Sequence, residues 1–202
     1  MNDAASIFKF GGDGDGDDAH SRTFVTSYFS SILPPLLEHA AHWTINHIHR
    51  SPLSLNMTIK SSSSNCASLC SNLDQILTCL SFSIVDEESD VSTATKRCAT
   101  VLGSSVLACT LFEVILPRLS SAISGMSTPE KLSSSLLVLT CVMDGMKVSD
   151  LSDASSAVCS TLASASILDC NDRDVMDALL VCTQAFVTAC EGSGLLQSND
   201  EG

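Results

Sequence analysis

Two histidines on one predicted helix are the residues whose types and spacing come nearest to a metal site. His39 and His42 lie three residues apart beside Glu38, and Cys66 and Cys70 lie four residues apart further along the chain. Zinc sites usually have three or four such ligands, held by supporting hydrogen bonds. No C-x-x-C pair and no H-E-x-x-H motif occurs. We therefore expect no metal and no other cofactor. The alternative is a metal-binding or Cys-dependent enzyme that uses His39, His42 and a cysteine.

An acidic tract near the start of the chain resembles the opening of a calcium-binding loop. Asp13, Asp15 and Asp17 alternate as the first ligands of such a loop do. The same loop needs glycine and glutamate where Asp18 and Phe24 stand. The tract is therefore interpreted as a flexible acidic arm.

The sequence displays no arrangement typical of nucleophilic catalysis. A cysteine nucleophile needs a thiolate of low pKa, usually beside a histidine or a helix N-terminus. All five histidines precede residue 50, whereas the cysteines follow it. There is also no G-x-S-x-G elbow, no G-x-G-x-x-G motif and no phosphate-binding loop. We predict that the protein is not an enzyme.

Composition predicts a single domain with an aliphatic core. Of 202 residues, 45% are hydrophobic but only 4% are aromatic, so Leu, Val, Ile, Ala, Cys and Met must form the core. The ten cysteines follow no recognisable secretory leader and lie mostly within apolar runs. We expect them to be reduced, in the cytoplasm or the nucleus. No segment reaches the roughly 18 apolar residues that span a membrane.

The charge balance bears on the kind of partner. The formal net charge is −13, and the ten basic residues are scattered. Binding to nucleic acid depends on Lys and Arg side chains that neutralise phosphates. We therefore expect a protein partner and no direct contact with nucleic acid or with a membrane. A basic partner surface would fit this charge, and the alternative is that the acidic face is simply solvated.

Apolar residues recur at helical spacing along most of the chain, and no strand pattern is present. The predicted helices cover about 21–32, 35–49, 65–84, 91–116, 129–145 and 150–168, with a last one between Asn171 and Gly192. We expect the chain to begin with a flexible acidic arm (1–20), followed by a helical hairpin (21–50) and a Ser-rich linker (51–64). A helical repeat-like domain (65–191) and a polar tail (192–202) follow.

Helix boundaries are signalled by capping residues and prolines. Thr128 can cap a helix that starts at Pro129, since proline needs no hydrogen-bond acceptor in a first turn. Asn171 can cap the last helix, with Asp174 as its capping-box partner. Pro117 should kink or end the helix that contains it.

Four short runs share an Ile or Val, then Leu, then any residue, then Cys. Their cysteines recur at nearly constant intervals and are Cys79, Cys109, Cys141 and Cys170. Intervals of this size fall within the range of about 20–50 residues at which stacked helix-pair units repeat. With its small and aliphatic helix faces, the stretch 65–190 resembles HEAT- and armadillo-type solenoids. That resemblance implies an all-α fold of antiparallel helical pairs, and an irregular helical bundle is the alternative.

The last helix offers the best candidates for a partner interface. Its stripe of Val175, Leu179, Cys182, Phe186 and Cys190 is widened by further apolar residues. A polar cap normally covers the end of a solenoid, so an apolar end helix indicates a binding face. The residues we predict at the interface are Leu179, Leu180 and Phe186, and the alternative is that they pack on the two preceding helices.

The predicted function is a non-catalytic interaction or scaffold subunit that recognises a partner through helix faces. An open alternative is that the chain folds only within an assembly.

Overall fold

The computed structural model describes residues 31, 33, 35, 66–121 and 128–192, and every regular element in these residues is an α-helix. The helices from residue 66 onward are α3 (Cys66–Ser71), α4 (Leu73–Ser83), α5 (Ser89–Ser105), α6 (Ala108–Ser121), α7 (Pro129–Gly145), α8 (Val148–Leu162), α9 (Ala165–Leu168) and α10 (Arg173–Gly192). The predicted all-α fold is confirmed. The arm, the linker and most of the predicted hairpin and tail lie outside the described residues, so those boundaries stay predictions.

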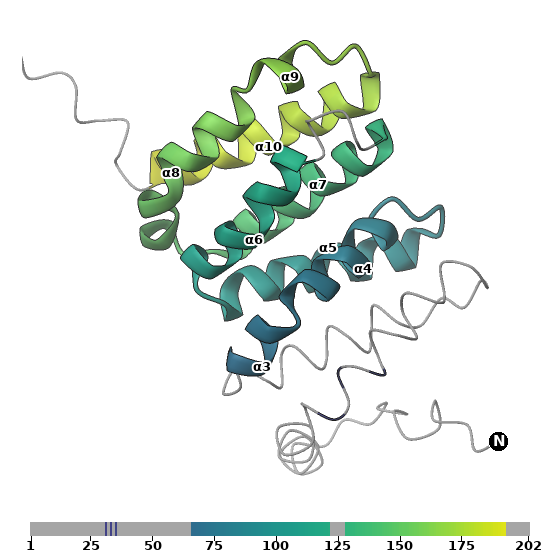
Figure 1. The fold of residues 1–202 in the computed structure, drawn as a ribbon, viewed down its shortest axis with the longest axis vertical. Coiled ribbons are helices and arrows are strands. Elements are labelled where there is room, and N and C mark those ends of the chain that lie inside the picture. The colour runs from purple at the N-terminus through teal and green to yellow at the C-terminus, as the bar shows by residue number, and fades with distance from the viewer. Residues whose placement is uncertain (1–30, 32, 34, 36–65, 122–127, 193–202) are drawn as a thin grey trace, which may run out of the picture.

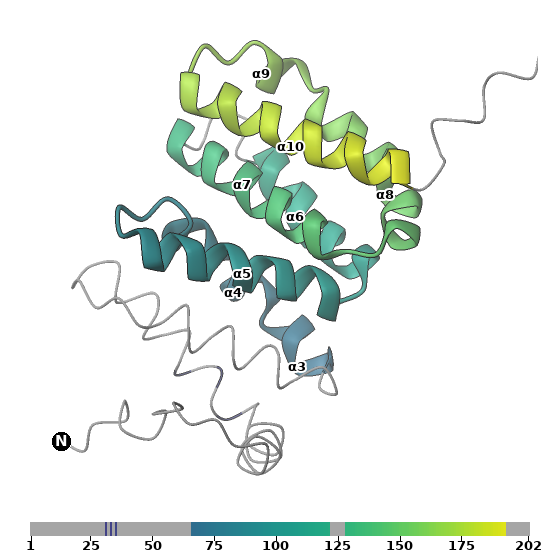
Figure 2. The same ribbon diagram turned by 180° about the vertical axis from the view of Figure 1, so that it is seen from behind.

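The helices stack in two layers along the long axis of the molecule (Figure 1). One layer contains α4, α6 and α8, and the other contains α5, α7 and α10 (Figure 2). In the second layer α7 lies between α5 and α10 and packs closely against both. Successive helical pairs therefore cover one another, which is how a solenoid buries its apolar faces.

The structural repeat is longer than the interval between the cysteine runs. Helix α5 begins at Ser89 and α7 at Pro129, and the same offset separates the start of α6 at Ala108 from that of α8 at Val148. The cysteine runs do not mark this repeat. Cys79 and Cys141 lie inside α4 and α7, Cys109 is the second residue of α6, and Cys170 lies between α9 and α10. The regular spacing of the cysteines was therefore a coincidence, although the stacked helix pairs that it suggested are present.

Three predicted helices are each divided in two. The predicted helix 91–116 separates into α5 and α6 at Val106, whose backbone is extended with φ −115° and ψ 143°. The chain reversal at this point buries Val106 and lets α6 join the other layer. The predicted helix 65–84 is interrupted at Asn72, and 150–168 divides into α8 and α9.

Pro117 does not end its helix, because contacts beyond it hold the last turn. Proline cannot donate a backbone hydrogen bond, yet α6 continues to Ser121. Leu119 is fully buried. Arg118 donates from Nη1 to the backbone oxygen and Oδ1 of Asp74, at 2.6 and 2.7 Å, and from Nη2 to Thr78 Oγ1 at 2.7 Å. These bonds connect α6 to α4.

The two predicted N-terminal caps differ from the structure in their details. Thr128 stands at the cap position of α7, but its side chain makes no capping hydrogen bond. The cap of α10 is Asp172 rather than Asn171, because Asp172 Oδ1 accepts a hydrogen bond from the Val175 backbone amide at 3.1 Å. An aspartate at this position satisfies one of the amides that a helix start leaves unpaired.

Two glycines set the distance between α5 and α7. A Cβ atom added to Gly103 in α5 would overlap the backbone oxygen of Val142 in α7. A Cβ atom added to Gly145 in α7 would overlap the backbone oxygen of Thr100 in α5. Each helix thus presents a glycine to the backbone of the other. The sequence alone does not reveal this role of Gly103, because the role depends on a partner helix distant in the sequence.

Candidate protein-interaction surface

The three predicted interface residues do not share one environment. Leu179 and Phe186 in α10 are each only 6% exposed and pack in the core, whereas Leu180 is 67% exposed. The buried residues belong to the stripe from Val175 to Cys190, which faces the rest of the stack. Of the three, Leu180 alone lies on the surface of the described structure.

Leu180 belongs to an apolar stripe on the outer side of α10. Met176 and Val187 are 39% and 40% exposed and lie four residues before and seven residues after Leu180. These spacings place all three on one side of the helix. We call Met176, Leu180 and Val187 the outer stripe. Val181 is also apolar and is 47% exposed. It follows Leu180 directly, so it points about a quarter of a turn away from the outer stripe.

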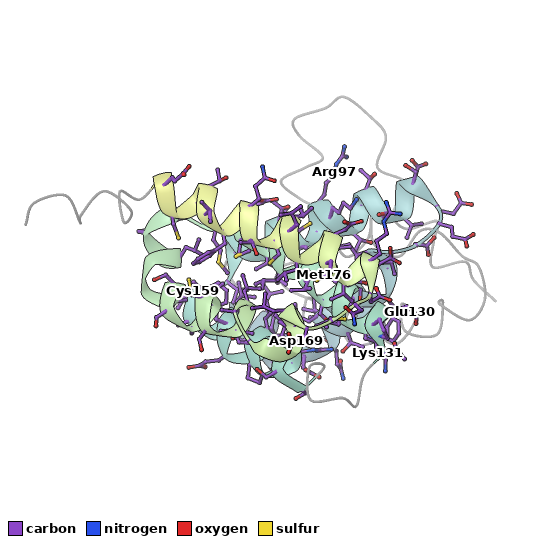
Figure 3. All side chains as sticks on the ribbon, turned by 90° about the horizontal axis from the view of Figure 1, so that it is seen from above. Arg97, Glu130, Lys131, Cys159, Asp169 and Met176 are labelled. Carbon is purple, nitrogen blue, oxygen red and sulfur yellow. The ribbon has the colours of Figure 1, made fainter. Side chains whose placement is uncertain are left out.

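The sequence carries a signal of the outer stripe, although it does not tell which side of α10 is covered. Met176, Leu180 and Val187 are the residues that widen an inner stripe already complete without them. Burial of one helix face needs only the inner stripe, so the additional apolar residues are the signal of a second contact. Figure 3 looks along the long axis onto this end of the stack, where Met176 lies on α10 and Asp169 lies in the turn before it.

Acidic residues flank the outer stripe on α10. From Val148 to Gly192 the sequence contains seven acidic residues and one basic residue, Arg173. Asp177 and Glu191 are both exposed on α10. Asp177 directly follows Met176, and Glu191 lies four residues after Val187. Arg173 Nε lies 3.7 Å from Asp177 Oδ2, with both side chains largely in solvent. This face therefore combines apolar contact area with negative charge.

The buried thiols of the stack are poorly suited to nucleophilic attack. Burial raises the pKa of Cys98, which lies in α5, and that of Cys79 in α4. Burial also raises the pKa of Cys141 to about 11, helped by the negative charge of Asp144. It raises the pKa of Cys182 to about 11, although a hydrogen bond with Thr140 acts in the opposite direction. At neutral pH these groups are protonated thiols rather than reactive thiolates.

The proposed metal ligands are not brought together by the described residues. His39 and His42 lie outside the part of the chain that the structure describes, as does the side chain of Cys66. Within residues 66–121 and 128–192, no three His, Cys, Asp or Glu side chains gather in a way that could hold a metal ion. None of the described helices is both long and apolar enough to cross a membrane.

Comparison with known proteins gives one consistent match. The model of the HEAT-repeat domain of dynein axonemal assembly factor 5 matches residues 18–198. Human dynein axonemal assembly factor 5 is 28% identical over 170 residues, which are 84% of this chain and 19% of that protein. The chain thus spans about a fifth of the length of this relative. No solved structure matches the chain.

Proposed function

This chain belongs to the family of the HEAT-repeat domain of dynein axonemal assembly factor 5, and on that premise we propose that it is a non-catalytic scaffold in the assembly of axonemal dynein. The resemblance of the sequence to HEAT-type repeats is thereby confirmed. The name of the human relative describes an assembly factor. We extend that role to this chain and place it in the cytoplasm.

The observation that carries the proposal is the outer stripe of α10. Leu180, 67% exposed, lies on a helix whose opposite side is fully occupied by the core. Exposed apolar groups that form a row on a rigid helix are typical of protein contacts. The acidic residues around the row favour a partner with a basic surface.

We do not propose catalysis for this protein. The pKa values of Cys98, Cys141 and Cys182 are raised by burial, which makes their thiols weak nucleophiles. No observation on the described residues favours the alternative in which His39, His42 and a cysteine act together.

Depletion of the protein in a ciliated cell tests the proposed function. Axonemal dynein chains should then remain unassembled, and sucrose gradients of cytoplasmic extract should show them sedimenting more slowly. Re-expression of the wild-type chain should restore the faster-sedimenting complexes. If dynein complexes formed normally in depleted cells, the proposed function would be wrong.

A further inference from the structure

We propose that Thr128 is a phosphorylation site of a proline-directed protein kinase, and that the phosphate, once attached, caps the N-terminus of α7. This modification does not depend on the scaffold function proposed above. Three observations support it: the sequence that follows Thr128, the exposure and backbone conformation of the site, and the charge of the surrounding segment.

Thr128 begins a sequence of the kind that proline-directed kinases select. Pro129 follows it directly, and Lys131 stands three residues after it. These kinases offer no acceptor for the amide of the residue after the phosphorylated hydroxyl, so proline, which has no N–H group, leaves no hydrogen bond unmade. The lysine adds a charged contact with the kinase. In the other Ser-Pro or Thr-Pro step of the sequence, at Ser51, a serine stands in place of this lysine.

The site is open to solvent, and its acceptor residue is extended. The four residues from Thr128 to Lys131 are all exposed, and Leu132 is the first buried residue of α7. Glu130 and Lys131 lie at the edge of the stack (Figure 3). The backbone of Thr128 has φ −72° and ψ 153°, and its side chain makes no capping hydrogen bond. The acceptor therefore lies just outside the helix, in the extended conformation in which kinases bind their substrates.

A kinase needs to open only the first turn of α7 to bind the motif. The amides of Lys131 and Leu132 donate to the backbone oxygen of Thr128 at 3.0 and 3.3 Å, and these are the first hydrogen bonds of the helix. Pro129 has no amide hydrogen to contribute. Helix ends fray, and local opening costs least where side chains are exposed. Opening this turn breaks backbone hydrogen bonds but moves no side chain of the core.

The phosphoryl transfer requires ATP as the donor. The Oγ1 atom of Thr128 forms a bond with the γ-phosphorus of ATP, the bond from that phosphorus to the bridging oxygen breaks, and ADP leaves. The hydroxyl proton passes to the catalytic aspartate of the kinase. The new group carries a charge of about −1.5 to −2 at neutral pH.

The segment around Thr128 is suited to this added charge, although the whole chain has a net charge of −13. Between Arg118 and Asp144 the only charged residues are Glu130 and Lys131, so the segment itself is neutral. A phosphate on the residue that precedes a helix lies at the positive end of the helix dipole and accepts hydrogen bonds from backbone amides. Lys131 is the third residue of α7, the position from which a side chain reaches back to the cap. Its ammonium group can therefore pair with the phosphate.

Phosphorylation of the folded full chain provides the test. The probe is a purified cyclin-dependent kinase with Mg²⁺ and ATP, and tandem mass spectrometry of peptides locates the phosphate. We expect a phosphate at Thr128 in the wild-type chain and none at this position in Thr128→Ala. Ser51→Ala is the matched control and should retain full incorporation at Thr128. Lys131→Ala should lower kcat/KM at Thr128 about tenfold, because the charged contact with the kinase is lost. The peptide that contains Thr128, isolated from ciliated cells, should carry the same phosphate.

Thermal unfolding tests the capping role of the phosphate. The midpoint of the phosphorylated chain should lie about 1–4 °C above that of the unmodified chain at low salt, and the difference should shrink at high salt. An equal or lower midpoint would overturn the capping role. A phosphate that entered Thr128 only after heat denaturation, or that was absent from the cellular peptide, would overturn the site. None of these outcomes alters the result expected from the depletion experiment.

Discussion

At the scale of single residues, the close contact between α5 and α7 depends on two positions that carry no side chain. Gly103 and Gly145 permit the backbones of α5 and α7 to approach so closely that no Cβ atom fits at either position. Glycine costs a helix about 1 kcal/mol relative to alanine in an exposed interior position. At these two positions the close helix contact offsets that cost.

Gly103→Ala should therefore destabilise the protein, although alanine is the better helix former. The added methyl group overlaps the backbone oxygen of Val142, which cannot move without shifting α7. We expect a loss of about 1–3 kcal/mol in the free energy of unfolding, as for other overpacked sites. Urea denaturation measures it. The exposed neighbour Ser104 supplies the control, since Ser104→Ala should change stability by less than about 0.5 kcal/mol.

The buried thiol of Cys182 should make stability depend on alkaline pH. Its pKa is about 11 in the folded chain, against about 8.5 for an unperturbed cysteine. Between these values the unfolded chain releases a proton that the folded chain retains, so the free energy of unfolding falls as pH rises. Below about pH 8 both states are protonated and this effect vanishes.

Cys182→Ala should make the decline between about pH 8.5 and 10.5 less steep than in the wild type. Urea denaturation at several pH values gives both slopes, and the other titrating groups are common to the two proteins. Identical slopes would show that this thiol does not keep its proton in the folded state.

At the scale of helices, α10 has two apolar sides, of which one is buried and the other exposed. Its inner side carries Leu179 and Phe186 in the core, and its outer side carries Leu180. The periodicity of the sequence revealed that α10 is widely apolar. It could not separate the two sides, because which side is covered depends on where α7 lies.

Phe186→Ala and Leu180→Asp should separate the inner side of α10 from the outer side. Phe186→Ala leaves a cavity in the core and should cost about 3–5 kcal/mol of unfolding free energy. Leu180→Asp changes a surface residue and should alter it by less than about 0.5 kcal/mol. Thermal and urea unfolding of the two variants measures both effects. A large loss in Leu180→Asp would mean that Leu180 packs within the protein.

Arg118 secures the contact between α6 and α4. Arg118→Ala removes the bonds to Asp74 and Thr78, but Asp74 is 74% exposed, so solvent weakens the ion pair. We expect a loss of about 1 kcal/mol, smaller at high salt. As a control, Arg173→Ala breaks a longer and more exposed pair with Asp177 and should cost less than about 0.5 kcal/mol. Equal losses in the two variants would contradict a special role for Arg118.

At the scale of the whole molecule, local signals predicted the helices better than their connections. Pro129 and Glu130 mark the start of α7, which the structure places at Pro129. The break at Val106 and the continuation through Pro117 were missed, because both depend on contacts between distant segments. Val106 is buried by the chain reversal, and Arg118 binds a residue 44 positions away.

The sequence predicted stacked helix pairs correctly, but it did not predict the length of the structural repeat. Regularly spaced cysteines indicated stacked helix pairs, yet the helices themselves recur at a longer interval, as the starts of α5 and α7 show. Hydrophobic periodicity records that a face is buried without recording which helix buries it. For the same reason the inner stripe of α10 and its outer stripe could be told apart only in the structure.

The central proposal is that the chain acts as a scaffold and binds a partner through the outer stripe of α10. Its most direct test is affinity purification of tagged full-length chain from ciliated cells, with axonemal dynein chains quantified by mass spectrometry for wild type, Leu180→Asp and Val181→Asp. We predict that dynein chains co-purify with wild type and Val181→Asp, and that Leu180→Asp recovers at least about tenfold less, equivalent to about 1.4 kcal/mol of binding free energy. Equal recovery with Leu180→Asp and wild type, from proteins with the same thermal stability, would contradict the claim.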